Sequence, residues 1–157
     1  MTLKLKPLQE LPGLLEGKRL VLANGCFDIL HVGHLRYLQG ARALGDSLVV
    51  AINSDRSVKS IKEPGRPILD EKERVALVAA LSCVDYIVLF DEPDVSRVIN
   101  VLRPAIHAKG TDYTEGTVPE RQQVLQYGGA VRITGDPKQH STRDIIRCIV
   151  HKKSDPS

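Results

Sequence analysis

Two patterns of apolar and polar positions alternate along the chain. Short continuous apolar runs, typical of strands buried on both faces of a parallel sheet, recur five times. They cover residues 19–23, 47–52, 86–89, 105–108 and 131–134. Between them lie segments whose apolar residues recur every three or four positions, which is typical of helices that bury one face. The pattern predicts that strands and helices alternate.

The predicted helices have recognisable starts. The first covers residues 32–44, where Gly45 can end it, and a short one covers 54–61. Other helices begin at Asp94 and at three pairs of side chains placed to satisfy the free N–H groups of a helix start. These pairs are Asp70 with Glu73, Thr117 with Glu120, and Ser141 with Asp144. The helix after Asp70 is expected to turn four apolar side chains toward a core, namely Val75, Leu77, Val78 and Leu81.

Strands that alternate with helices predict a parallel sheet wound with right-handed crossovers. The expected fold is therefore a three-layer, Rossmann-like α/β domain with a five-stranded parallel sheet. One domain covers residues 1–157 with its core at about 18–150, and the ends up to Gly17 and beyond Lys152 are expected to be expendable.

In sheets of this kind, ligands bind beyond the carboxyl ends of the strands. Polar or glycine-bearing segments follow four of the predicted strands. They cover residues 24–34, 53–62, 109–113 and 135–142. We expect these segments to meet on one rim of the domain.

Residues 24–35 read Asn-Gly-Cys-Phe-Asp-Ile-Leu-His-Val-Gly-His-Leu, where the first strand gives way to the first helix. His31 and His34 are three residues apart and share a helix face, and Gly33 leaves no side chain between the rings. The free N–H groups and positive dipole end of the helix point the same way. Gly25 lets the preceding loop approach a ligand closely. This arrangement predicts an anion-binding site.

Two other interpretations of the histidine pair compete with the anion site. A zinc site could use both histidines with Cys26, although metal-binding pairs on a helix are usually four residues apart and need further ligands. Alternatively, one histidine caps the helix while the other packs against the core. The position of the pair between an apolar strand and a helix start favours the anion site.

Length and composition fit one cytoplasmic domain. The chain has 157 residues, of which 42% are hydrophobic. No apolar run approaches the roughly 20 residues that cross a bilayer, and residues 1–18 lack the apolar stretch of a signal peptide. Cys26, Cys83 and Cys148 are scattered and are expected to be reduced thiols. We expect no membrane partner.

Charge gives no case for nucleic acid as a partner. The net charge is +3, from 22 basic and 19 acidic residues, and aromatic residues make up only 4% of the chain. One local cluster has more meaning, since four basic side chains surround a Pro-Gly pair. It consists of Arg56, Lys59, Lys62 and Arg66. The cluster either closes over a polyanionic ligand or forms a solvated loop.

The phosphate-binding glycine motifs of P-loop and dinucleotide-binding proteins are absent from the sequence, so a phosphate site needs another construction. Asn24-Gly-Cys-Phe-Asp28 followed by His31-Val-Gly-His34 resembles the HxGH nucleotidyltransferases, a family of cytidylyl- and adenylyltransferases. Three further motifs occur in the matching order: Asn53-Ser-Asp55, Lys109-Gly-Thr-Asp-Tyr113 and His140-Ser-Thr142. The resemblance covers about residues 18–150.

Within that family the chain is most similar to the adenylyltransferase domain of ADP-heptose synthases, and next to glycerol-3-phosphate cytidylyltransferases. It departs from the first group at Thr111, where glycine is usual, and at His140, where an apolar residue or cysteine is usual. The cytidylyltransferases carry Arg-Thr-x-Gly before Ser-Thr, whereas this chain has Asp136-Pro-Lys-Gln139. These departures concern the sugar phosphate more than the reaction.

The resemblance implies that a phosphate oxygen of an acceptor attacks the α-phosphate of a nucleoside triphosphate and expels pyrophosphate. His31 and His34 would donate hydrogen bonds to the triphosphate. Ser141 and Thr142, with the N–H groups of the last helix start, would bind its β- and γ-phosphates. Mg²⁺ is expected because the triphosphate needs charge compensation, without a dedicated carboxylate cage.

The same resemblance assigns the remaining site residues. The catalytic set is His31, His34 and Lys62, with either Lys62 or Lys59 reaching the phosphates from a flexible, lid-like loop. The nucleotide-binding set is Asn24, Gly25, Cys26, Phe27, Asp28, Gly33, Lys59, Lys109, Asp112, Ser141 and Thr142. The acceptor-binding set is Asp55 and Arg74, and no metal ligand is assigned.

Several of these side chains have two candidate roles. Asp28 either orders the loop before the helix, which is preferred, or positions nucleotide or metal. Lys109, Asp112 and Arg74 either contact base, ribose or acceptor phosphate, or form surface salt bridges. Four aromatic side chains outside the histidine pair have these expected places: Phe27 beneath the loop, Tyr113 at the core edge or beside the nucleotide, and His107 and His151 in structural or solvent-facing positions.

The leading hypothesis is an enzyme that transfers AMP from ATP to a sugar 1-phosphate resembling heptose 1-phosphate. The alternatives are a cytidylyltransferase for glycerol 3-phosphate or a similar polyol phosphate, and a nucleotide-binding module without catalysis. An adenylyltransferase of coenzyme biosynthesis fits the first motif less well. The resemblance also implies a homodimer.

Overall fold

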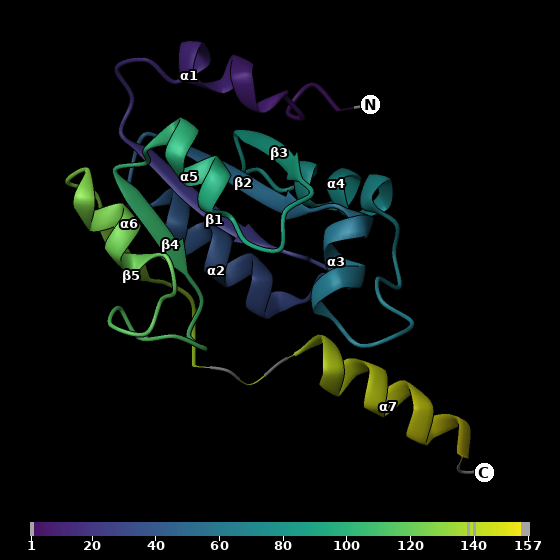
Figure 1. The fold of residues 1–157 in the computed structure, drawn as a ribbon. Coiled ribbons are helices and arrows are strands. Elements are labelled where there is room, and N and C mark those ends of the chain that lie inside the picture. Colours follow the sequence, from purple (N-terminus) through teal and green to yellow (C-terminus); the bar gives the residue numbers. More distant parts are fainter. Residues whose placement is uncertain (1, 138, 140, 155–157) are drawn as a thin grey trace.

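A five-stranded sheet runs through the centre of the structure, which is a computed structural model describing residues 2–137, 139 and 141–154 (Figure 1). The strands are β1 (Leu20–Gly25), β2 (Ser47–Asn53), β3 (Tyr86–Phe90), β4 (Ile106–Lys109) and β5 (Ala130–Ile133). Their order is β3-β2-β1-β4-β5, and every neighbouring pair is parallel. The predicted five-stranded parallel sheet is confirmed, with each strand within two residues of its expected bounds.

Helices cover both faces of this sheet. The helices of the structure are η1 (Leu8–Glu10), α1 (Leu11–Leu14), α2 (Val32–Arg42), α3 (Asp55–Ile61), α4 (Glu71–Ala79), α5 (Ser96–Leu102), α6 (Arg121–Gln126) and α7 (Thr142–Ser154), of which α7 stands away from the sheet (Figure 1). The first core cluster joins α2 and α4 to one face, and the second joins η1, α1, α5 and α6 to the other. The predicted three-layer α/β architecture is therefore confirmed. No helix in the described part of the chain is long and apolar enough to cross a bilayer.

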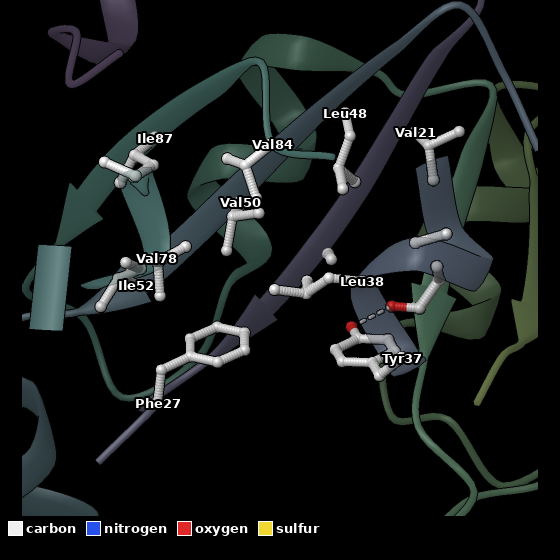
Figure 2. Packing of buried hydrophobic residues seen from close by; sticks show 14 of the residues in the cluster. Val21, Phe27, Tyr37, Leu38, Leu48, Val50, Ile52, Val78, Val84 and Ile87 are labelled. Carbon is white, nitrogen blue, oxygen red and sulfur yellow. Dashed lines mark hydrogen bonds between the residues drawn. The ribbon is translucent and has the colours of Figure 1, made fainter. Parts of the chain in front are cut away.

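Alternation along β1 shows how one strand serves both layers. Val21 and Ala23 belong to the α2 and α4 cluster, whereas Leu20 and Leu22 belong to the opposite cluster. In the first cluster, Leu38 of α2 and Phe27 lie among the side chains of β1 and β2 (Figure 2). The strand is apolar from Leu20 to Ala23 because both of its faces are buried there.

A buried hydroxyl in the same cluster connects α2 to the sheet. Tyr37 donates a hydrogen bond of 2.6 Å to the carbonyl oxygen of Ala108 in β4, drawn as a dashed line in Figure 2. Burial removes water from this phenol and raises its pKa well above the usual value. The tyrosine is therefore a fixed neutral donor that sets the distance between α2 and the β1–β4 pair.

Of the three predicted capping pairs, two are confirmed and one is wrong. Asp70 and Glu73 exchange hydrogen bonds at the start of α4, and Ser141 Oγ accepts from the backbone N–H of Asp144 at the start of α7. Thr117 does not cap a helix, because its hydroxyl accepts from the N–H of Thr114 in a preceding turn. Helix α6 begins only after Glu120 and has no side-chain cap.

Three details of packing differ from the sequence prediction. Leu77 is 46% exposed, because the buried arc of α4 runs through Val75, Val78 and Ala79 instead. Helix α2 ends at Arg42, before the expected glycine. Gly45 has a packing role, since a Cβ there would come within 2.5 Å of the carbonyl oxygen of Arg19.

The segment before residue 18, expected to be expendable, belongs to the fold. Leu8, Leu11 and Leu15 are buried in the second core cluster, and Leu5 forms a parallel bridge with Ile87 of β3. The leucines cover the sheet face that α5 and α6 leave open. The sequence pattern missed this because the two turns of η1 and α1 are too short to show helical periodicity.

Truncating Leu11 tests this correction. We expect Leu11→Ala to lower the free energy of unfolding by about 2–5 kcal/mol, because it empties a fully buried site. Urea denaturation measures the loss. Leu14→Ala, at a residue 41% exposed, is the matched control and should change stability far less. Equal, small losses in both variants would show that the segment does not belong to the core.

Candidate active site

A cavity of about 680 Å³ opens at the carboxyl edge of the sheet. Residues from all four predicted rim segments line it, so their convergence is confirmed. The lining includes thirteen of the expected site residues: Asn24, Gly25, Cys26, Phe27, Asp28, His31, Gly33, His34, Lys62, Lys109, Asp112, Ser141 and Thr142. His140 lies outside the described residues.

The histidine pair forms a reciprocal cap at the start of α2. His31 is the N-cap residue, and its Nδ1 accepts from the N–H of Gly33 at 3.1 Å. Nδ1 of His34 accepts from the N–H of His31 at 3.3 Å. A ring nitrogen that accepts carries no proton, so each neutral imidazole has its proton on Nε2. The rings stack with centroids 3.9 Å apart, and both residues line the cavity.

The structure also indicates the charge of His34. Burial, together with the neighbouring His31, lowers the pKa of His34 to about 4. The ring is therefore neutral near pH 7 and can donate from Nε2 without carrying a full charge. The capping role and the anion-binding role, posed as alternatives from the sequence, are thus compatible because they use different ring nitrogens.

The zinc alternative finds no support in the described residues. They contain no group of three or more histidine, cysteine or acidic side chains arranged to hold a metal ion. Both Nδ1 atoms of the histidine pair are already hydrogen-bonded to the backbone. Cys26 is a free thiol whose pKa burial raises, which disfavours a metal-binding thiolate.

Asp28 orders the loop before α4, whereas the sequence predicts that it orders the loop before the histidine-bearing helix α2. Its carboxylate accepts from Arg66 Nε at 2.7 Å and from the N–H groups of Ile68 and Leu69 at 2.8 and 2.9 Å. Burial alone would raise the pKa of Asp28, but these hydrogen bonds and the Arg66 charge lower it overall. Both carboxylate oxygens are engaged within the protein, and Asp28 also lines the cavity, so its contact with a nucleotide stays a prediction.

Arg74 and Asp55 are also misplaced as acceptor ligands. Arg74 is fully buried, and its guanidinium donates to the carbonyl oxygens of Cys26 and Asn53 at 2.6 and 2.7 Å. It also pairs with Asp55 at 2.9 Å, and neither residue lines the cavity. The arginine therefore braces the ends of β1 and β2. Arg74 lies four residues before the buried Val78, and this helical spacing is the sequence signal that could have predicted its burial.

The basic cluster around the Pro-Gly pair separates into different roles. Lys62 lines the cavity, whereas Lys59 lies on the exposed side of α3 and does not. Arg66 is buried against Asp28, and Arg56 is exposed. Of the two candidate lid lysines, only Lys62 is thus placed to reach a ligand, and the nucleotide contact expected of Lys59 is corrected.

Asn24 is held by two donors from β4. Its Oδ1 accepts from His107 Nε2 at 2.9 Å and lies 3.4 Å from Lys109 Nζ. His107 is fully buried, so it is structural and not solvent-facing, and burial with the nearby Lys109 lowers its pKa to about 3. Lys109 Nζ lies 4.8 Å above the Tyr113 ring, which lines the cavity. Sequence reasoning missed the role of His107, because a histidine inside an apolar strand gives no sign of its partner.

The last helix joins the site through its first residues. Thr142 donates from its hydroxyl to the carbonyl oxygen of Asp28 at 2.8 Å, while Ser141 is occupied by its cap with Asp144. The two hydroxyls are thus used within the protein. The backbone N–H groups of the helix start are what remains for an anion.

Two residues that depart from the family pattern contact each other. Thr111 donates from its hydroxyl to the carbonyl oxygen of Asp136 at 2.8 Å, and the Asp136 carboxylate pairs with Arg36 at 2.7 Å. These contacts join the loops after β4 and β5 to α2. Thr111 and Asp136 therefore lie together at one wall of the cavity.

Glu120 lines the cavity, although its position in the sequence predicts only a capping role. It is 9% exposed, and its Oε2 has no hydrogen-bond partner among the described residues. An acidic residue before a predicted helix resembles a cap, so no sequence signal distinguished the two roles.

Comparison with known proteins gives one family. The family described as cytidylyltransferase-like matches residues 22–147. Among curated proteins, the bifunctional protein HldE of Syntrophotalea carbinolica is 49% identical over 136 residues, covering 87% of this chain and 28% of that protein. HldE of Geobacter metallireducens is 47% identical, covering 91% and 30%. The chain thus spans less than a third of the length of these relatives.

Solved structures agree with this match. A lipopolysaccharide core biosynthesis protein from Thermoplasma volcanium superposes with a TM-score of 0.61 at 34% identity, covering 74% of this chain and 94% of that one. Pantothenate synthetase from Thermus thermophilus gives a TM-score of 0.60 at 17% identity, covering 88% and 63%. The second likeness shows the fold alone.

Removing the negative charge of Asp28 should destabilise the loop between α3 and α4. We expect Asp28→Asn to lower the free energy of unfolding by about 3 kcal/mol, because it leaves Arg66 buried without its charge partner. Glu63→Gln is the matched control, since Glu63 pairs with the same arginine at 3.2 Å on the exposed side and should matter little. Urea denaturation compares the two, and a larger loss in the control would refute the assignment.

Stability should depend on the protonation of His34. Its folded pKa of about 4 lies below the ordinary value of 6.5, so the unfolded chain binds more protons between these values. The neutral ring therefore contributes stability above pH 6.5 that is lost as the pH falls toward 4. We expect His34→Asn, which keeps an acceptor but does not titrate, to lose less stability over this window than the parent.

Thermal unfolding between pH 7 and 4.5 measures this difference. His151→Asn, on the exposed part of α7, is the control and should follow the parent. A parent and a His34 variant with parallel pH dependence would show that the ring is not held neutral by burial.

Proposed function

The chain belongs to the cytidylyltransferase-like family, as its motifs predicted, and on this premise we propose that it is a nucleotidyltransferase. We propose that it transfers AMP from ATP to a sugar 1-phosphate resembling heptose 1-phosphate and releases pyrophosphate. The observation that carries the proposal is the stacked histidine pair, which lines the cavity and accepts backbone N–H groups on both Nδ1 atoms. The Nε2 N–H donors of this pair are suited to an anion whose charge increases during the reaction.

The chemistry is a displacement at phosphorus. An oxygen of the acceptor phosphate attacks the α-phosphorus of ATP, and the bond from that phosphorus to the bridging oxygen of the β-phosphate breaks. The electron pair leaves with pyrophosphate. His31 and His34 donate hydrogen bonds to the oxygens that gain charge, and Lys62 approaches from the loop after α3. The first N–H groups of α7 bind the outer phosphates.

The supporting structure holds these groups in place before a ligand arrives. Asp28 and Arg66 fix the loop between α3 and α4, and Lys62 stands at its beginning. Thr142 joins the start of α7 to the same anchor. Because phosphoryl transfer asks a protein mainly for positioning and charge neutralisation, such preorganisation is the main contribution this chain can make.

The choice of ATP and of a sugar acceptor has separate support. The relatives named HldE align over most of this chain, and the motifs resemble the adenylyltransferase domain of ADP-heptose synthases. The 34% identical structure is described as a lipopolysaccharide core biosynthesis protein. Residues 136–139 lack the Arg-Thr-x-Gly sequence typical of the cytidylyltransferases.

In this proposal Mg²⁺ is bound by the phosphates of ATP. The described residues form no cluster of three metal ligands, and the Asp28 carboxylate is engaged by Arg66 and two backbone N–H groups. Mg²⁺ keeps several waters and is commonly held by nucleotide phosphates, which suits a cavity without a carboxylate cage. We place the ion on ATP and assign it no protein ligand. A homodimer in the cytoplasm completes the proposal.

A pyrophosphate assay tests the reaction. The protein is incubated with each of the four nucleoside triphosphates and a panel of sugar and polyol phosphates. We expect turnover with ATP and a sugar 1-phosphate, and a fall in kcat of about 10²–10³ in His34→Ala, because one preorganised donor is lost. His151→Ala should retain full activity. Turnover with CTP but not ATP, or unchanged turnover in His34→Ala, would contradict the proposal.

A further inference from the structure

The side chain of Asn24 joins the cavity to a buried residue of β4. Leu22 of β1 lies in register with His107 of β4, and the next residues on the same face of each strand are Asn24 and Lys109. Oδ1 of Asn24 lies 2.9 Å from Nε2 of His107 and 3.4 Å from Nζ of Lys109. Asn24 and Lys109 line the cavity, whereas His107 is fully buried.

These contacts determine the orientation of the amide and the position of the ring proton. Lys109 donates from Nζ, so the amide atom that faces it is the oxygen and not the NH₂ group. The same oxygen faces His107, which must therefore donate from Nε2. Nδ1 of His107 then carries no proton, and it has no hydrogen-bond partner among the residues that the structure describes. Burial lowers the pKa of His107 to about 3, so the neutral ring keeps this one proton near pH 7.

The NH₂ group is what the Asn24 side chain can offer to a ligand, because Oδ1 is already engaged by two donors. Within the described part of the chain, no hydrogen bond engages Nδ2. An amide nitrogen donates but does not accept, and it does not titrate. Three acidic residues also line the cavity, namely Asp94, Asp112 and Glu120, and two of them act on the charge of Lys109. An uncharged donor is therefore a useful addition to this partly balanced cation.

Resting on the proposed function, we propose that His107 is a positioning residue that keeps the Asn24 amide turned so that Nδ2 donates to a phosphate oxygen of a substrate. Phosphate oxygens are strong acceptors, and both ATP and the sugar phosphate supply them. An amide turned the other way would set Oδ1 against such an oxygen, so that two acceptors would face each other. His107 thus acts through Asn24 and needs no contact with the substrate.

Nitrogen-15 NMR of the parent protein tests the arrangement directly. We expect the ring proton of His107 on Nε2, and an Asn24 side-chain amide signal that is identified by its absence from Asn24→Asp. This signal should shift with α,β-methylene-ATP and Mg²⁺, or with a sugar 1-phosphate from the pyrophosphate assay, and the ligand that moves it identifies the source of the phosphate. A proton on Nδ1, no shift with any of these ligands, or an equal shift with the sugar lacking its phosphate would overturn the inference.

Two substitutions separate positioning from stability. We expect His107→Leu, which removes the donor, to lower kcat/KM about 10-fold for the substrate that shifts the amide signal, and His107→Gln, which keeps a side-chain donor, to stay within about threefold of the parent. Leucine should unfold at no lower a temperature than glutamine, because it buries no additional polar atom. His151→Leu, on the exposed part of α7, is the control and should retain full activity. Activities that follow the order of thermal stability would show a structural role and overturn the inference.

A double-mutant cycle tests whether His107 acts through Asn24. In Asn24→Ala, where no amide remains to be positioned, adding His107→Leu should change kcat/KM less than about twofold. A further 10-fold loss in that background would overturn the inference and leave the proposed function intact. A parent that is inactive with every substrate would overturn the proposed function, whereas the ring proton and the response of the amide to the ATP analogue would still test the inference by themselves.

Discussion

The buried ion pair between Asp28 and Arg66 determines the arrangement of the site. A carboxylate removed from water must be compensated, and here one arginine and two backbone N–H groups do so. All three donors come from the loop between α3 and α4, whereas Asp28 comes from the loop between β1 and α2. The two loops can therefore adopt only arrangements that keep these donors together. Arg74 adds a second bond from α4 to the ends of β1 and β2.

The sheet explains why the polar groups gather where they do. Both faces are covered by helices, so the strands are apolar along most of their length. Their carboxyl ends are the first places where polar side chains can stand without being buried under a helix. Asn24 and Lys109 occupy such positions at the ends of β1 and β4. Burial of His107, next to Lys109 in β4, lowers its pKa and keeps the ring neutral. The ring is hydrogen-bonded to Asn24.

Sequence predicted the layers and the rim well, because periodicity and strand order follow from local patterns that need no knowledge of distant partners. It also predicted that His31, His34, Ser141 and Thr142 would meet at this rim, where all four line the cavity. It was wrong about Arg74 and Asp55, whose roles depend on carbonyl groups brought together only by folding. It also missed Glu120 and the core leucines before residue 18. A charged side chain at a helix start has the same local sequence whether it caps the helix or faces a cavity.

The hydrogen bond from Thr142 to Asp28 links residues 114 positions apart. During synthesis from the N-terminus, the ribosome delivers the histidine pair and its anchor long before the residues that close the anion site. A nascent chain ending before α7 therefore holds a sheet and both core layers around an incomplete pocket. The wall of the cavity that Ser141 and Thr142 supply would then be added only after every strand of the sheet has been synthesised.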